Sequence, residues 1–220
     1  MPGQAPNLHL NGDGRAQAEA LAKLLEKQPI AAIYSSHLER AIETAWRIAA
    51  PRGLPIHIRR TLADTDTGDY TARTIKEISE AEGSRDSWKV ILEKPSLARL
   101  PNGESLLEMQ ARVVAELTRI CAAYPDPEPP KEASGEHPDS GSSDTAKSAP
   151  PTQSSPPPEP PAPAIILVLM HADPIKAALA HFLGMPFDNF QRLGTSPASV
   201  STVMVHGDQV MVMNINRTAQ

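Results

Sequence analysis

The sequence lacks the features that mark disulfide-bonded, membrane-spanning and exported proteins. Its 220 residues include one cysteine, Cys121, so neither an internal disulfide nor a cysteine-based zinc site can form, and apolar neighbours at helical spacing predict a core position for it. No run approaches the roughly 18 consecutive apolar residues of a membrane span. The first residues, MPGQAPNLHLNGDG, lack the basic and then apolar order of a secretory signal. We therefore expect a cytoplasmic protein without a membrane partner.

An excess of basic charge is absent as well. The formal net charge is −5, and residues 125–163 alone carry seven acidic residues against two lysines. The rest of the chain carries 19 acidic and 19 basic residues, so it is formally neutral. Because a nucleic-acid-binding face needs clustered basic residues, we expect no nucleic-acid partner.

Proline, serine and glutamate are concentrated in one segment. Residues 125–163 hold 13 of the 23 prolines and no large apolar side chain, so they cannot bury enough surface to offset the entropy of ordering. We expect a disordered insertion, although its proline runs would also suit a polyproline II segment that docks in an aromatic groove. The chain after it is too short for a typical domain and begins with an apolar strand that needs partners. Residues 1–124 and 164–220 are therefore predicted to form one discontinuous domain.

Helical and strand patterns alternate along this domain. Short apolar runs indicate strands, whereas apolar residues at spacings of three and four indicate helices. Their alternation predicts an α/β fold, a three-layer α/β/α sandwich with a mostly parallel sheet. In such sheets ligands bind beyond the carboxyl ends of the strands, which directs attention to the loops at 35–40 and 171–174. The expected strands are 30–34, 56–58, 164–170, 199–205 and 210–214, and the expected helices lie at about 11–25, 38–50, 74–78, 88–92, 105–123 and 173–183.

Three residues near these loops could carry chemistry. Arg40, in SSHLERAIETA, opens a helix directly after a strand, where free amides and a guanidinium favour phosphate. His171, in VLMHADPIK, stands at the tip of the most apolar strand and could donate to a phosphoryl oxygen. Glu104, in PNGES, could act as a general acid or base. Taken singly, each is also explained as a surface arginine, a structural histidine or an acid that stabilises a helix start.

Together and in this order, these motifs resemble the histidine phosphatase superfamily, which includes phosphoglycerate mutases. LNGDGRAQA and the acidic, glycine-containing loop 62–74 extend the resemblance over nearly all of the chain outside the insertion. The resemblance implies a phosphoglycerate mutase-like fold and transfer of a phosphoryl group to a histidine, with no metal or other cofactor. By matching position, Arg40 and His171 would bind the phosphate. The catalytic residues would be His171, which stabilises the phosphoryl oxygens, and Glu104, which protonates the leaving oxygen.

The sequence departs from the family at the nucleophile. The family's accepting histidine lies in an Arg-His-Gly segment at the end of its first strand, and no Arg-His dipeptide occurs in residues 1–220. We therefore expect the first strand to be missing and this chain to be inactive. His37 and His9 are weaker candidates for a replacement nucleophile. Our leading hypothesis is a start codon placed too late or a truncated gene, with a complete protein that hydrolyses phosphomonoesters through a phosphohistidine.

Two alternative functions stay open at this stage. Phosphoglycerate mutase activity uses the same chemistry, but the basic, proline-rich insert of glycolytic mutases is not visible between Thr74 and Glu104. A non-catalytic protein that binds a phosphorylated ligand would retain Arg40 and His171 without turnover. In each case the expected partner is a small phosphorylated metabolite.

Overall fold

The computed structural model describes residues 1–82, 87–125 and 163–219, so nearly all of the predicted insertion lies outside the described residues. One compact unit comprises Met1–Pro125 and Ala164–Gln220. No helix in the described ranges is long and apolar enough to cross a bilayer. The helices are α1 (Gly12–Leu24), α2 (Glu39–Ala49), α3 (Ile75–Glu82), α4 (Ser87–Glu93), α5 (Leu106–Ala122) and α6 (Ala172–Phe182), and the strands are β1 (Ile30–Ser35), β2 (Ile56–Ile58), β3 (Ile165–Leu169), β4 (Val200–His206) and β5 (Gln209–Arg217).

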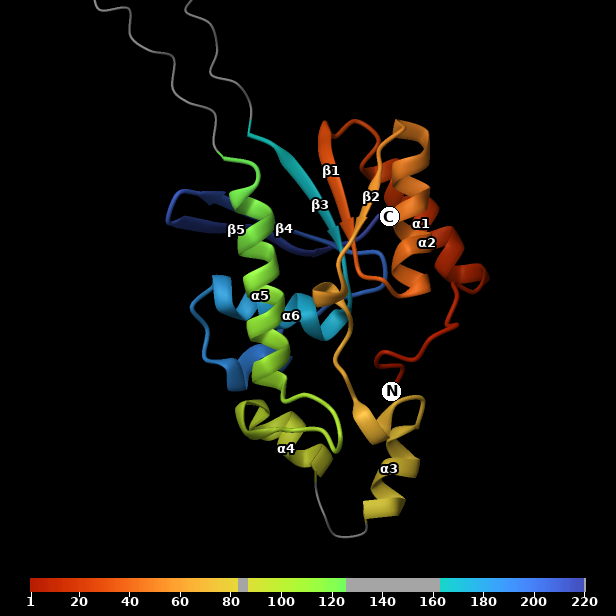
Figure 1. The fold of residues 1–220 in the computed structure, drawn as a ribbon, viewed down its shortest axis with the longest axis vertical. Helices are drawn as coiled ribbons and strands as arrows, with labels where there is room; N and C mark the ends of the chain where they lie inside the picture. Colours follow the sequence, from red (N-terminus) through yellow and green to blue (C-terminus); the bar gives the residue numbers. More distant parts are fainter. Residues whose placement is uncertain (83–86, 126–162, 220) are drawn as a thin grey trace, which may run out of the picture. The chain divides into compact units, whose positions relative to one another are not determined.

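The central sheet is parallel and has the order β2-β1-β3, while β4 and β5 form a separate antiparallel hairpin (Figure 1). Ser35, the last residue of β1, is the register partner of both Ile58 in β2 and Leu169 in β3. The three strands therefore end at one edge, and the loops that follow them start there together. This architecture confirms the predicted α/β fold with a mostly parallel sheet.

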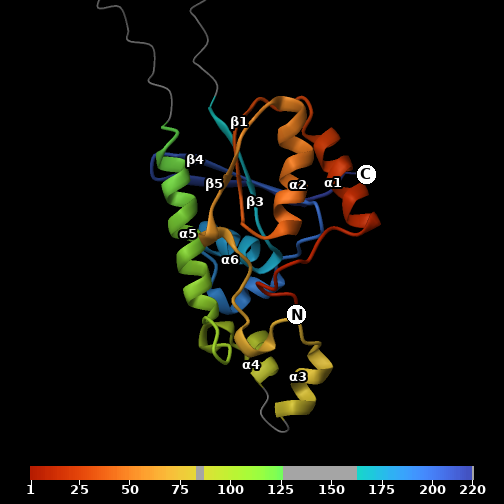
Figure 2. The same ribbon diagram turned by 45° about the vertical axis from the view of Figure 1, so that its right-hand side comes forward.

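Helices cover both faces of the sheet. Figures 1 and 2 show α1 and α2 on one side and α5 on the other. Successive residues of a strand point to opposite faces, so Ile33 of β1 packs in a cluster with Ile48 of α2, whereas Tyr34 packs in a cluster with Ile120 of α5. The result is the predicted three-layer arrangement of helix, sheet and helix.

The strand β3 is covered on both faces, as its continuous apolar run predicted. Ile166 and Val168 pack on the α5 side, and Leu167 and Leu169 pack on the side of α1 and α2. Within the part of the chain that the structure describes, however, only β1 pairs with β3, so its second edge has no strand partner. Ile165 at its start is 37% exposed. An apolar pattern reports which faces of a strand are covered and carries no information about its edges.

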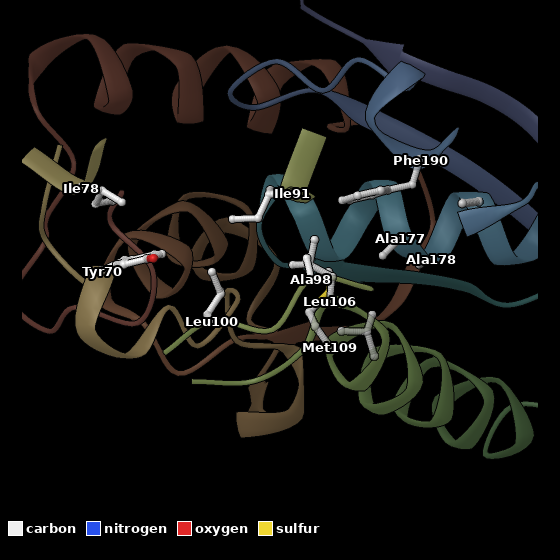
Figure 3. Close-up of a cluster of buried hydrophobic side chains, with 12 residues drawn as sticks. Tyr70, Ile78, Ile91, Ala98, Leu100, Leu106, Met109, Ala177, Ala178 and Phe190 are labelled. Carbon is white, nitrogen blue, oxygen red and sulfur yellow. The ribbon is translucent and has the colours of Figure 1, made fainter. Parts of the chain in front are cut away.

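A third apolar cluster lies beyond the sheet and joins α5 to α6 (Figure 3). Met109 and Val113 of α5 are fully buried there with Ala177 of α6 and Phe190. Ile91 of α4 belongs to the same cluster. Because α5 also covers the sheet, this packing holds the start of α6 at the carboxyl edge of β3.

Helix starts follow their local signals. The Asn11 side chain caps α1 by accepting from the Gly14 amide at 2.8 Å. At the start of α5 the Ser105 hydroxyl accepts from the Glu108 amide, while the Glu108 carboxylate accepts from the Ser105 amide, which is the predicted capping box. These bonds set where α1 and α5 begin.

The prediction of a core position for Cys121 is wrong. Its side chain is only partly buried, although burial is enough to raise the pKa of its thiol. The neighbouring Ile120 takes the inward position, and the next residue of a helix lies about 100° further round the axis. Cys121 therefore lies at the margin of the buried face of α5.

Candidate functional site

The loops that leave the carboxyl edge of the sheet bring together residues from three segments. Arg40 follows β1 and lies in the first turn of α2. Asp64 lies in the segment after β2, and His171 follows β3 as the N-cap residue of α6. The helices α2 and α6 therefore both begin at the carboxyl edge of the sheet. Their free backbone amides and helix dipoles favour an anion there.

Asp64 is the meeting point of the two predicted phosphate ligands. Arg40 donates from Nη2 to Asp64 Oδ2 at 3.3 Å and to the Gly3 carbonyl at 2.8 Å. His171 Nδ1 lies 4.0 Å from the same Asp64 oxygen, and its Nε2 lies 2.9 Å from the Ser36 hydroxyl. The structure thus brings Arg40 and His171 together, although they are distant in sequence. We call Ser36, Arg40, Asp64 and His171 the Asp64 centre.

Glu104 is joined to the Asp64 centre through a second arginine. Its two oxygens accept from Arg112, at 2.6 Å from Nη2 and 2.8 Å from Nε, and the Asp66 amide donates to it at 2.8 Å. The same guanidinium donates at 2.9 Å to the backbone carbonyls of Thr61, Ala63 and Asp64. Arg112 therefore fixes the backbone that carries Asp64, and Glu104 fixes Arg112.

Two glycines allow the loop with Asp66 to approach the turn before Glu104. A Cβ at Gly68, which has φ +49°, would lie 2.1 Å from the Pro101 carbonyl oxygen, and one at Gly103 would lie 2.4 Å from the Asp66 carbonyl oxygen. Both contacts are with backbone, so a larger residue would separate the loops. The glycines noted in the acidic loop and in PNGES thus have a steric role.

Burial keeps the imidazole of His171 neutral. The residue is 8% exposed, and desolvation, followed by the positive charges of Arg40 and Arg112, lowers its pKa to about 3. An anion bound between Arg40 and His171 would offset these effects and favour the protonated ring. His171 is therefore suited to respond to the charge of a ligand.

Burial has the opposite effect on Asp64. Desolvation, with repulsion from Asp173, raises the pKa of the Asp64 carboxyl to about 6, against the hydrogen bonds from the Thr65 amide and Arg40. A carboxyl group in this range can give up and regain a proton near neutral pH. Perturbed groups of this kind gather at functional sites more often than elsewhere.

Two buried nitrogens at this edge have no hydrogen-bond partner among the described residues. They are Nη1 of Arg40 and Nδ1 of His37. Burial, together with the nearby charge of Arg60, lowers the pKa of His37. Because buried polar groups are nearly always paired, a free guanidinium nitrogen next to His171 indicates the place of an acceptor that a ligand would supply.

No group of three or more His, Cys, Asp and Glu side chains suited to a metal ion occurs within the described ranges. The hydrogen-bond donors of the Asp64 centre are a guanidinium, an imidazole and a hydroxyl. These three groups suit an oxyanion, and the Asp64 carboxyl opposes it only when charged.

Sequence reasoning missed Asp64, Ser36 and Arg112. Asp64 stands in the acidic loop noted for its glycines, and Ser36 stands in the motif that contains Arg40, so the motifs held a signal for both. Arg112 lies mid-helix beside Ala111 and Val113, and no motif around it marks it as part of a site.

Sulfate binding to the Asp64 centre is expected to weaken by at least about tenfold between about pH 5 and about pH 7.5. The Asp64 carboxyl, with a pKa of about 6, is mostly neutral at the lower pH. At the higher pH its negative charge repels the anion and competes for Arg40. Sulfate is the suitable probe because its charge stays constant over this range, and calorimetric titration at several pH values gives the dissociation constants.

The matched control for this experiment is Asp64→Asn. In the free protein His171 stays neutral over this range because its pKa is about 3, and the arginines stay charged. Any proton that His171 takes up when sulfate binds contributes to the slope that remains in Asp64→Asn. His37 has a lowered pKa and can gain a proton only toward the acid end, so the slope that remains in Asp64→Asn measures its contribution. An equal slope in the wild type and in Asp64→Asn would remove Asp64 from the explanation.

Comparison with known sequences gives a family match that spans most of the chain. Residues 2–128 and 158–218 match the Histidine phosphatase superfamily (branch 1). This match covers the segments that contain Arg40, Asp64, Glu104 and His171.

Two individual relatives share 31% and 22% sequence identity with this chain over the residues matched. Glucosyl-3-phosphoglycerate phosphatase of Mycobacterium tuberculosis is 31% identical over 127 residues, which are 57% of this chain and 55% of that protein, so the chain spans about half the length of this relative. Phosphoserine phosphatase 1 of Hydrogenobacter thermophilus is 22% identical over 209 residues, 95% of this chain and 81% of that protein. The solved structure of a mycobacterial glucosyl-3-phosphoglycerate phosphatase with inorganic phosphate superposes with a TM-score of 0.72 at 25% identity, covering 100% of this chain and 92% of that one.

Proposed function

Because this chain belongs to the histidine phosphatase superfamily (branch 1), we propose that its Asp64 centre binds the phosphoryl group of a small phosphorylated metabolite and serves phosphomonoester hydrolysis. The observation that carries the proposal is the convergence of Arg40 and His171 on one largely buried carboxyl, that of Asp64, with a guanidinium nitrogen of Arg40 left without a partner among the described residues. Relatives of this chain bear the names of phosphatases for small phosphorylated compounds, which supports the substrate class.

In the proposed reaction an accepting histidine attacks phosphorus, forming a P–N bond as the ester P–O bond breaks. Arg40 binds the phosphoryl oxygens, and His171 donates to them as charge develops. A carboxyl group protonates the leaving alkoxide. Water then attacks phosphorus and breaks the P–N bond, returning its proton to the same carboxylate and releasing inorganic phosphate.

We assign the acid role in this scheme to Asp64 and a positioning role to Glu104. Asp64 contacts the phosphate ligands directly and has a pKa of about 6, so it can hold a proton near neutral pH. Both oxygens of Glu104 accept from Arg112, which in turn donates to the backbone carbonyl of Asp64. The sequence-based role of Glu104 as the acid stays as the alternative.

Residues 1–220 contain no Arg-His motif, so we propose that this chain binds phosphate tightly but turns over phosphomonoesters very slowly. A purely phosphate-binding protein is therefore the second candidate function. Both functions require the same anion site, and turnover distinguishes them.

Replacing Arg40 with Met is expected to weaken the binding of inorganic phosphate or vanadate by about 100-fold, because a charge-assisted partner is lost from a buried site. Calorimetric titration of the 220-residue chain measures this affinity. Arg47→Met is the matched control, since Arg47 lies on the same helix and pairs with exposed Glu19 at 3.7 Å. An Arg40→Met variant that is folded and binds phosphate like the wild type would exclude this site.

A further inference from the structure

A cavity of about 200 Å³ adjoins the Asp64 centre. Its wall includes Thr65, the residue after Asp64, and Asp173, which lies two residues after His171 in the first turn of α6. The amide of Thr65 donates to Asp64 Oδ1, and the charge of Asp173 contributes to the raised pKa of Asp64, so both residues are close to the Asp64 centre. The cavity is therefore a candidate for the place where the remainder of a phosphate ester is bound.

One side of the cavity is apolar. Ile91, Leu100 and Leu106 line it and belong to the apolar cluster drawn in Figure 3, where they are 6%, 2% and 2% exposed. These side chains come from α4, from the segment before Glu104 and from the first turn of α5. A surface of this kind favours hydrocarbon over a charged or heavily hydroxylated group.

Thr65 also lines the cavity, and its hydroxyl lacks a hydrogen-bond partner among the described residues. Thr65 is 3% exposed, and its Oγ1 is buried with no hydrogen-bond partner in the described part of the chain. Its backbone amide is already used, since it donates to Asp64 Oδ1 at 2.9 Å. A buried hydroxyl without a partner is costly, so a ligand atom that pairs with it would bind favourably.

The basic side chain in the cavity wall is neutralised within the protein. Lys176 Nζ donates to Asp173 Oδ1 at 2.7 Å and to Gln191 Oε1 at 2.6 Å, and it lies 5.3 Å from the centre of the Phe190 ring. A ligand carboxylate entering here would meet Asp173 and a lysine that is already paired. Met1 also lines the cavity, and its amine donates to the Arg73 carbonyl. Burying a ligand carboxylate beside Asp173, with no unpaired lysine or arginine side chain in the cavity wall, is unfavourable.

We propose that this cavity binds the leaving alcohol of the substrate, and that this alcohol is a small, uncharged and largely apolar group. This inference rests on the proposed function of the Asp64 centre and adds the substrate class. An engineered apolar cavity of about 150 Å³ in another protein binds benzene, so a cavity of about 200 Å³ accommodates a group on the scale of one aromatic ring. Thr65 pairs with the ester oxygen or with the first polar atom of that alcohol.

Calorimetric titration of the 220-residue chain with three probes tests the inference. The probes are inorganic phosphate, phenyl phosphate and 3-phosphoglycerate. We expect phenyl phosphate to bind at least about tenfold more tightly than inorganic phosphate, since the ring leaves water. We expect 3-phosphoglycerate to bind no more tightly than inorganic phosphate.

The matched variants are Thr65→Val, which replaces the hydroxyl with a methyl group of similar shape, and Thr65→Ser, which keeps the hydroxyl. Thr65→Val is expected to weaken phenyl phosphate binding about threefold to tenfold and to leave inorganic phosphate binding unchanged, whereas Thr65→Ser should bind phenyl phosphate like the wild type.

The outcomes separate this inference from the proposed function. Equal affinities for phenyl phosphate and inorganic phosphate, or tighter binding of 3-phosphoglycerate, would overturn the inference and leave the phosphate site in place. Failure of all three probes to bind would overturn the proposed function itself.

Discussion

Residues 1–220 are expected to release phosphate from p-nitrophenyl phosphate about 10⁶-fold more slowly than a version of the chain that carries an accepting histidine. In another hydrolase, removal of the nucleophile lowers turnover by about this factor, because binding and charge stabilisation remain while the covalent step is lost. The Asp64 centre provides Arg40 and His171 for the phosphoryl oxygens. Neither residue replaces the nucleophile in the proposed scheme.

The structure suggests how to build the active version for this comparison. The second edge of β3 has no strand partner in the described part of the chain, and β3 ends two residues before His171. An apolar strand fused ahead of Met1 and paired in parallel with β3 would also end at this edge of the sheet. If that strand ends in Arg-His-Gly, its imidazole lies near the Asp64 centre, and a fusion ending in Arg-Gln-Gly is the matched control.

Initial rates of phosphate release from the unfused chain and the two fusions show whether turnover requires the added histidine. Turnover by the unfused chain close to that of the Arg-His-Gly fusion would contradict the prediction. Loss of that turnover in His37→Gln would then identify His37 as the nucleophile.

The active fusion also separates the two candidate acids, Asp64 and Glu104. Loss of the acid slows the hydrolysis of esters with poor leaving groups most, so the variant with this pattern, Asp64→Asn or Glu104→Gln, identifies the acid.

Replacement of Arg112 with Met is expected to lower the free energy of unfolding by up to about 3–5 kcal/mol, which is the cost of removing one partner of a fully buried ion pair. The side chain of Arg112 is 21% exposed and that of Glu104 is 14% exposed, so the carboxylate left behind is poorly hydrated. The carbonyls of Thr61, Ala63 and Asp64 also lose their shared donor. Urea denaturation followed by circular dichroism measures the loss.

A matched control for Arg112→Met is Arg99→Met. Arg99 pairs with Glu108, but the two side chains are 58% and 54% exposed, and such surface pairs contribute less than about 1 kcal/mol. Adding Glu104→Gln to Arg112→Met should restore part of the stability, because the buried charge is removed. Equal losses of unfolding free energy for Arg99→Met and Arg112→Met would show that the network around Arg112 stabilises the fold no more than a surface ion pair does.

Local patterns predicted most of the secondary structure because each signal acts over a few residues. The capping box of Ser105 and Glu108 and the cap at Asn11 satisfy backbone groups within the same turn. The apolar run before His171 identified β3 for the same reason. Cys121 was misplaced because one position along a helix separates a buried residue from a partly exposed one.

For the site, the sequence by itself determined the residues that follow the strands. Arg40 and His171 could be named in advance because parallel strands end at one edge, so residues just after them come together whatever the details of packing. The tertiary structure alone decided that Asp64 joins them and that Glu104 is bound to Arg112. Arg112 contacts carbonyls 48 to 51 positions away along the chain, and such pairing depends on how α5 packs on the loop after β2, which no local pattern encodes.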